Sequence, residues 1–199
     1  MENNEKEIAE VTQEENKTKK ENSVWKDVLD FVKTMAISMI VVFLVAQFIF
    51  RPIRVRGSSM YPTLEDGSLG ISNVIGRNID GIERFDIVII KLANEDEFLV
   101  KRVIGLPGET VSYKDGQLYI NGEAIEEDFL DEDYMEDWGK YFMGDVEEYT
   151  LGENEYYCLG DNRPASKDSR YYGAFYDYEL IAKGVLIFYP FNLFGAHTW

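Results

Sequence analysis

The sequence predicts a mostly β domain preceded by one transmembrane α-helix. An uncharged apolar run at residues 34–50 predicts the helix. From residue 51 onward, short apolar or alternating segments recur at close spacing with turn residues between them, which is typical of a β-rich domain. Residues 123–154 interrupt this pattern with acids and aromatics of no clear period, and we expect a small, loosely structured acidic insertion there.

Composition limits the class of protein. The chain has 199 residues, 45% of them hydrophobic, enough for one domain with its own core. Its net charge of −17 argues against nucleic acid as a partner, because nucleic acids bind basic surfaces. Residues 122–155 hold 14 Asp and Glu but one Lys, so most of the excess is local, and such a run is usually a solvated face.

The single cysteine, Cys158, and the single histidine, His197, limit the chemistry. One cysteine cannot form a disulfide within the chain, and a metal site built from several Cys or His is excluded. His197 stands third from the end of the sequence with no obvious acid to orient it. We expect neither a cofactor nor a metal ion.

The transmembrane helix is predicted over residues 28–50. Seventeen uncharged residues would span only about 25 Å, so residues 31–33, with a snorkelling Lys33, are needed to cross a hydrocarbon core of roughly 30 Å. A buried core helix fits poorly, because the run is apolar on all faces. A cleaved signal peptide also fits poorly, because no small-residue cleavage pair follows so long a run.

The chain before this helix, residues 1–27, is polar and is expected to be a disordered cytoplasmic tail. Lysines outnumber the arginines that follow the helix, which favours an N-terminus inside the cell and the remaining chain outside. The charges compared are Lys17, Lys19, Lys20, Lys26 and Lys33 before it, and Arg51, Arg54 and Arg56 after it.

The β-rich domain is predicted over residues 51–122 and 155–199. Asp115-Gly116 and Asn121-Gly122 are predicted tight turns between strands. The aromatic end, 191–199, is either part of the core or a contact with the membrane interface. Strand-like segments are 51–56, 67–71, 85–90, 98–104, 111–113, 117–120, 155–159 and 181–189.

Two serines, Ser58 and Ser59, stand in a Gly-Ser-Ser-Met loop shortly after the apolar run. Most such serines are solvated turn residues, and a serine nucleophile needs a base. Lys101 is a candidate base, because in a strand it shares a face with Leu99 and Val103, and burial lowers the pKa of a lysine. The alternative is a lysine at a strand edge whose amine reaches water.

The polar block 160–170 would ordinarily be a surface loop, but its density of hydrogen-bonding groups also suits the wall of a site. Its acids can pair with nearby arginines, and its serines can hold an amine. The possible pairs are Asp161 or Asp168 with Arg102, Arg163 or Arg170, and the serines are Ser166 and Ser169.

Together these segments make residues 28–190 resemble the type I signal peptidases, membrane-anchored Ser/Lys proteases that cut signal peptides from exported proteins. Four motifs follow the anchor in the family's order, and the short insertion and single anchor look like the Gram-positive branch. The motifs are Ser-Met-Tyr-Pro-Thr-Leu (59–64), Asp-Ile-Val-Ile (86–89), Lys-Arg-Val-Ile-Gly-Leu-Pro-Gly (101–108), and Gly-Asp-Asn-Arg (160–163) followed by Ser166 and Asp168-Ser-Arg.

The resemblance implies a role for each matching residue. Ser59 would be the nucleophile, Lys101 the general base and Ser166 the hydroxyl that orients the lysine amine. The Ser59 backbone N–H would form the oxyanion hole, with a second N–H from Gly57, where some relatives carry a serine. Residues that would brace the site are Asp161, Arg102, Asp168 and Arg170.

The family's substrates are exported preproteins with small residues at the first and third positions before the cut. They would bind as an added strand beside residues 52–56 and 98–101, with Val55 and Val100 lining the small pockets. The lipid bilayer is the other expected partner, and the protein export machinery is a candidate partner.

Two other readings compete with a signal peptidase. Self-cleaving repressors share the chemistry on a similar β core, but this chain has an expected anchor and no DNA-binding domain. A membrane-tethered binding module without activity is the alternative outside enzymes, and the presence of Ser59, Lys101 and Ser166 argues against it.

Overall fold

A computed structural model of the chain describes residues 25–46, 50–92 and 97–197. The chain divides into two units, residues 1–47 and 48–199, and each is described by itself. The predicted polar tail lies outside the described residues as far as residue 24.

The apolar helix Trp25–Ala46 has 22 residues and buries none of its most apolar stretch. At 1.5 Å per residue it is about 33 Å long, enough for a hydrocarbon core of roughly 30 Å. By length and composition it is able to cross a membrane. It begins three residues before the predicted start at residue 28.

The larger sheet of the β-rich unit has eight strands, and all of its strand pairs are antiparallel. Seven of these strands follow one another in a row, and β12 (Gly195–His197) pairs with β11 outside that row. The row runs β1 (Phe50–Arg54), β2 (Leu69–Asn73), β11 (Leu180–Tyr189), β3 (Ile87–Lys91), β4 (Phe98–Gly105), β9 (Glu155–Leu159) and β10 (Phe175–Tyr176).

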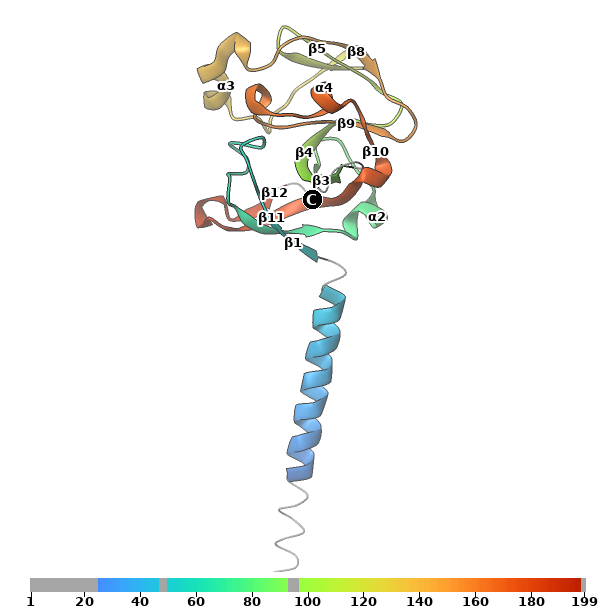
Figure 1. Cartoon of the computed structure of the whole chain (residues 1–199), viewed down its shortest axis with the longest axis vertical. Helices are drawn as coiled ribbons and strands as arrows, with labels where there is room; N and C mark the ends of the chain where they lie inside the picture. Colours follow the sequence, from blue (N-terminus) through green and yellow to red (C-terminus); the bar gives the residue numbers. More distant parts are fainter. Residues whose placement is uncertain (1–24, 47–49, 93–96, 198–199) are drawn as a thin grey trace, which may run out of the picture. The chain divides into compact units, whose positions relative to one another are not determined.

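The second sheet has four antiparallel strands in the order β7 (Glu123–Ile125), β6 (Gln117–Ile120), β5 (Thr110–Lys114) and β8 (Val146–Thr150). Its two tight turns are Asp115-Gly116 and Asn121-Gly122, as predicted. All four turn residues have positive φ, between 51° and 82°. Asn, Asp and Gly tolerate this conformation, which matches the twist of a two-residue hairpin. In Figure 1, β5, β8 and α3 lie on one side of β9, and β1 and β11 lie on the other.

Short helices connect the strands. α3 (Glu132–Trp138) is capped by Asp131, whose carboxylate accepts the Tyr134 N–H at 2.8 Å. The acids in its first turn interact favourably with the positive end of the helix dipole. The other helices are α2 (Gly76–Asp80), α4 (Ser169–Tyr172), and the 3-10 turns η1 (Gly139–Tyr141), η2 (Arg163–Ala165), η3 (Asp177–Glu179) and η4 (Phe191–Leu193).

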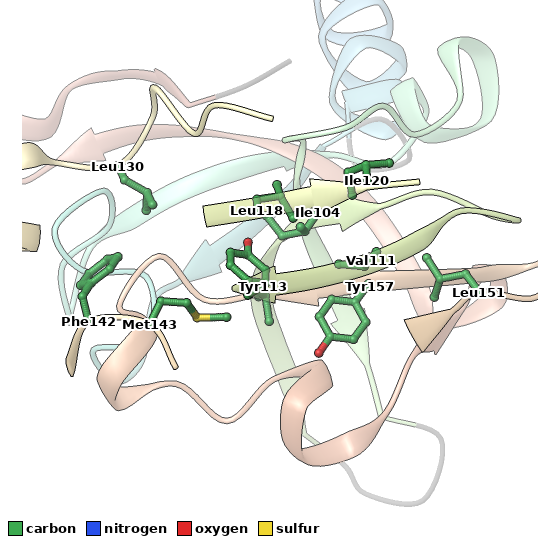
Figure 2. Packing of buried hydrophobic residues seen from close by; sticks show 11 residues of the cluster. Ile104, Val111, Tyr113, Leu118, Ile120, Leu130, Phe142, Met143, Leu151 and Tyr157 are labelled. Atoms are coloured by element: carbon green, nitrogen blue, oxygen red, sulfur yellow. The ribbon is translucent and has the colours of Figure 1, made fainter. Parts of the chain in front are cut away.

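The prediction that residues 123–154 are loosely structured is wrong. Two of their segments, β7 and β8, are strands of the smaller sheet. Leu130, Phe142 and Met143 are buried in one cluster with Val111 and Leu118 (Figure 2). The sequence showed no period here because each element is only three to seven residues long.

The aromatic C-terminal segment is part of the fold only through its backbone, and a membrane contact of its rings stays a prediction. Its backbone joins the larger sheet through β12, whereas the rings of Phe191 and Phe194 are 80% and 67% exposed. Residues 198–199 lie outside the described residues.

Candidate active site

Ser59 lies in the loop between β1 and β2. Two buried apolar side chains, Met60 and Leu64, hold this loop against the core, and the Leu64 N–H donates to the Met60 carbonyl at 2.8 Å. Ser58 is exposed and Ser59 is half-buried. The packing of Met60 therefore places the second serine, and not the first, toward the interior.

Lys101 lies in the middle of β4, opposite Val88 of β3, and is only 2% exposed. Its Nζ donates to Ser59 Oγ at 2.7 Å. The alternative of a lysine whose amine reaches water is wrong for this strand. The amine meets the serine hydroxyl across 42 residues of sequence, as the candidate pairing requires.

Burial sets the acidity of this amine. It lowers the pKa of Lys101 from 10.5 to about 8, against the attraction of Asp168, Cys158 and Asp161, which raises it. Burial disfavours the charged form because the interior solvates an ammonium poorly. A lysine with a pKa near 8 is partly neutral at physiological pH and can accept a proton.

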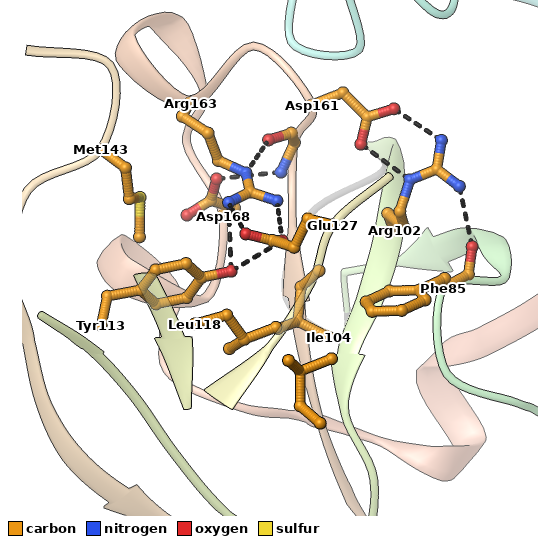
Figure 3. A network of polar contacts seen from close by, with 12 residues as sticks. Phe85, Arg102, Ile104, Tyr113, Leu118, Glu127, Met143, Asp161, Arg163 and Asp168 are labelled. Atoms are coloured by element: carbon orange, nitrogen blue, oxygen red, sulfur yellow. Dashed lines mark hydrogen bonds and ion pairs between the residues drawn. The ribbon is translucent and has the colours of Figure 1, made fainter. Parts of the chain in front are cut away.

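Arg102 extends from the opposite face of β4 and forms a buried ion pair with Asp161 (Figure 3). Its Nε and Nη2 donate to the two carboxylate oxygens at 2.9 and 2.7 Å. Thr63 Oγ1 donates to the same carboxylate at 2.6 Å. Arg102, the neighbour of Lys101, is therefore connected through Asp161 to Thr63 in the loop that carries Ser59 (residues 55–68, the serine loop).

Asp168 is fully buried and binds both Arg170 and the backbone. Arg170 Nε and Nη2 donate to it at 2.8 and 2.7 Å, and the Gly160 N–H donates at 3.1 Å. Burial alone would raise the pKa of Asp168, but the hydrogen bonds and charge of Arg170 hold it below its usual value. Asp168 is thus a fixed negative charge that orders the 160–170 loop.

Of the two serines that could hold the amine, neither is hydrogen-bonded to it. Ser169 Oγ accepts the Cys158 N–H at 2.9 Å and serves the backbone instead. Ser166 Oγ is buried beside the Asp168 carboxylate, whose pKa its hydroxyl helps to lower, and does not bond Lys101. It lies against Gly160, where an added Cβ would overlap it and the Ser59 carbonyl. Its role in orienting Lys101 stays a prediction.

Gly57 does not offer the expected second oxyanion donor. Its N–H donates to Asp66 Oδ1 at 2.8 Å, so that hydrogen is already used. Its φ of +81° explains why a glycine stands there, since side chains disfavour this conformation. For the Ser59 N–H, the described residues include no acceptor.

A groove of about 740 Å³ adjoins Ser59 and Lys101, and Val55 and Val100 line it. β1 and the first half of β4 both contribute to its walls. Within the described residues β1 pairs only with β2, and β9 pairs with β4 only from Arg102 onward. Both walls therefore offer unpaired strand backbone.

Several polar residues beside the site make contacts that the sequence did not indicate, although Asn162 and Arg163 stand in the Gly-Asp-Asn-Arg motif, and Arg163 pairs with a different acid from the two considered for it. Arg163 Nη2 pairs with Glu127 of the acidic segment at 2.6 Å, and Tyr113 OH donates to the same carboxylate at 3.0 Å (Figure 3). Asn162 donates to the carbonyls of Ser58 and Ser59. Because residues 123–154 contain many acids, the sequence does not indicate that Glu127 is the one that pairs with Arg163.

Comparisons with known proteins agree with the motifs. The family of signal peptidases, peptidase S26, matches residues 28–189. Signal peptidase IB of Staphylococcus aureus (strain COL) is 34% identical over 179 residues, 85% of this chain and 93% of that protein. Signal peptidase I of Bacillus licheniformis is 38% identical over 182 residues, 90% of this chain and 96% of that protein.

A crystal structure of a signal peptidase I from Enterococcus faecalis V583 is 37% identical in sequence. It covers 51% of this chain and 95% of its own, with a TM-score of 0.47. The family match spans most of the chain, and the relatives are covered almost completely. The chain therefore belongs to the type I signal peptidases, serine endopeptidases of peptidase family S26.

Proposed function

We propose that the protein removes N-terminal signal peptides from exported preproteins, with Ser59 as nucleophile and Lys101 as general base. The observation that carries this proposal is the 2.7 Å contact between the Ser59 hydroxyl and a buried lysine amine of lowered pKa. A serine is a weak nucleophile until a neighbouring base takes its proton. Lys101 is the base within reach.

The reaction begins with neutral Lys101 accepting the Ser59 proton while Oγ attacks the scissile carbonyl carbon. The developing oxyanion accepts a hydrogen bond from the Ser59 N–H. The Lys101 ammonium then gives its proton to the leaving amine, and the C–N bond breaks to leave an acyl-enzyme. Water attacks this ester with Lys101 again as base, which releases the signal peptide and restores Ser59.

The preprotein binds in the groove as an extended strand between β1 and the first half of β4. The unpaired backbone of both walls supports this mode, because main-chain hydrogen bonds give affinity whatever the sequence. Val55 and Val100 line the groove together with Ser59, and they would favour small side chains at the first and third positions before the cut.

The apolar helix anchors the protein as a single span, with the N-terminus in the cytoplasm and the β-rich unit outside. Its length supports a single span. The excess of lysines before it supports this orientation. The anchor would keep the site at the bilayer where a preprotein emerges, beside the export machinery.

The test is processing of a preprotein by the full chain in lipid vesicles, followed by gel mobility and N-terminal sequencing. Ser59→Ala and Lys101→Ala should abolish cleavage while far-UV circular dichroism stays unchanged. Ser58→Ala and Lys91→Ala are matched controls, since both residues are exposed, and they should cleave normally.

Cleavage by Lys101→Ala at a near-normal rate would show that Lys101 is not the base. A wild-type chain that binds signal peptides but never cuts them would favour the alternative, a binding module of the same fold.

A further inference from the structure

The direction of the Ser59 N–H is set by the carbonyl of the residue before it. A peptide unit is planar and trans, so the Ser58 C=O and the Ser59 N–H point in opposite directions. Two donors hold the Ser58 carbonyl: Asn162 Nδ2 at 2.8 Å and the Tyr61 N–H at 3.1 Å. Whatever fixes this carbonyl therefore fixes the proposed oxyanion donor.

Asn162 holds the serine loop at two successive carbonyls. Its side-chain amide donates to Ser58, and its backbone N–H donates to the Ser59 carbonyl at 3.1 Å. The Asn162 side chain is buried, which limits the competition of water for these bonds. The peptide units on both sides of the Ser59 Cα are thus tied to one residue.

The Asn162 side chain is in turn held in place by Tyr134 of α3. Tyr134 OH donates to Asn162 Oδ1 at 3.0 Å, which leaves the Nδ2 hydrogens for Ser58. A flipped amide would set its oxygen against the Ser58 oxygen, and neither can donate. The Ser58 carbonyl, which only accepts, therefore selects the amide orientation, and the Tyr134 hydroxyl, by donating to Oδ1, holds the side chain in the position that reaches the loop.

Tyr134 is itself held from several sides. Asp131 accepts its N–H at the start of α3, and its ring packs edge-on against Tyr61, with centroids 5.1 Å apart. It also meets Phe142 edge-on at 6.2 Å. Tyr61 stands two residues after Ser59, so α3 reaches the serine loop by ring packing as well as through Asn162.

We propose that Tyr134 and Asn162 are positioning residues, which hold the Ser58–Ser59 peptide so that the Ser59 N–H faces the developing oxyanion. This inference rests on the proposed function. It gives the acidic segment 123–154 a part in catalysis, because α3 carries the tyrosine that holds the Asn162 side chain.

The test compares transition-state and ground-state binding in the full-length, detergent-solubilised enzyme. A peptide aldehyde forms a hemiacetal with the Ser59 hydroxyl and needs the oxyanion donor, whereas a non-cleavable peptide of the same sequence does not. Asn162→Ala should lower kcat and weaken aldehyde binding about a hundredfold. Tyr134→Phe keeps the ring and loses one hydrogen bond, so it should lower kcat and the affinity for the aldehyde about tenfold each.

For both variants, KM and the affinity of the non-cleavable peptide should change less than about twofold, because these report uniform binding. Asn162→Asp should be worse than Asn162→Ala, since it sets an acceptor against the Ser58 carbonyl. Tyr141→Phe, in the same segment and exposed, is the matched control and should match the wild type.

Wild-type kcat and aldehyde affinity in Tyr134→Phe and Asn162→Ala would overturn the inference and leave the proposed function standing. Equal losses for aldehyde and non-cleavable peptide would also overturn it, because they indicate a general loss of structure. Ser59→Ala in the same assay separates the two claims: its cleavage of the peptide would refute the proposed function itself.

Discussion

The lowered pKa of Lys101 predicts the pH dependence of the reaction. Only the neutral amine can accept the Ser59 proton, so kcat/KM should rise with pH and level off above the pKa of the free enzyme. With a pKa of about 8, the neutral fraction is roughly one-tenth at pH 7, one-half at pH 8 and nine-tenths at pH 9. The rate should therefore rise about tenfold between pH 7 and 9.

A lysine with an ordinary pKa gives a different curve. At 10.5, the neutral fraction would rise about a hundredfold between pH 7 and 9 and would keep rising beyond pH 10. The two cases differ both in the size of the increase and in the presence of a plateau.

The assay is hydrolysis of a fluorogenic peptide with alanine at the first and third positions before the cut, from pH 6 to 10, in the detergent-solubilised enzyme. The far-UV spectrum at each pH is the control for unfolding. An increase of slope one that continues to pH 10, or a rate independent of pH, would refute the assignment of a buried neutral lysine.

Three further predictions concern stability and packing. Lys101→Met should raise the free energy of unfolding at pH 7 by about 1–3 kcal/mol in urea titrations. The unfolded chain binds more protons than the folded one between pH 8 and 10.5, so this advantage should shrink as pH rises through that window, and a constant difference would contradict it. Asp161→Asn should cost about 3–5 kcal/mol, because it leaves Arg102 buried without its counter-ion, and the pair Arg102→Met, Asp161→Leu should recover most of the loss. Gly160→Ala should lower activity at least about tenfold and destabilise by about 1–3 kcal/mol, since a new Cβ overlaps Ser166 and backbone; wild-type kinetics and melting temperature would show that the loop adapts.

Much of the fold could be predicted from local patterns, because strand alternation, tight turns and an apolar helix each depend on a few neighbouring residues. The alternation around Lys101 and the Asp115-Gly116 and Asn121-Gly122 turns required only strand and hairpin rules. The apolar helix followed from hydropathy in the same way. Strands β7 and β8 were missed, because each has at most five residues and its pairing partner decides its conformation.

The sequence motifs indicated the serine and lysine at the centre of the site, but not the hydrogen-bond partners of the residues around them. The contact of Ser59 with Lys101 agrees with the motifs. The use of the Gly57 N–H by Asp66 depends on a loop geometry that no spacing rule expresses. The bond from Tyr134 to Asn162 joins residues 28 apart, one in the short helix α3 and one in the 160–170 loop, so neither periodicity nor charge marks it.

The central claim is that the Ser59 hydroxyl attacks the substrate and that Lys101 activates it. The most direct measurement is intact mass and peptide mapping of the enzyme after brief reaction with an activated peptide ester, quenched in acid. We expect one acyl group per chain, on Ser59, and none in the Lys101→Met variant. An acyl group on Ser58 or elsewhere, or acylation of Ser59 that is as fast in Lys101→Met as in the wild type, would contradict it.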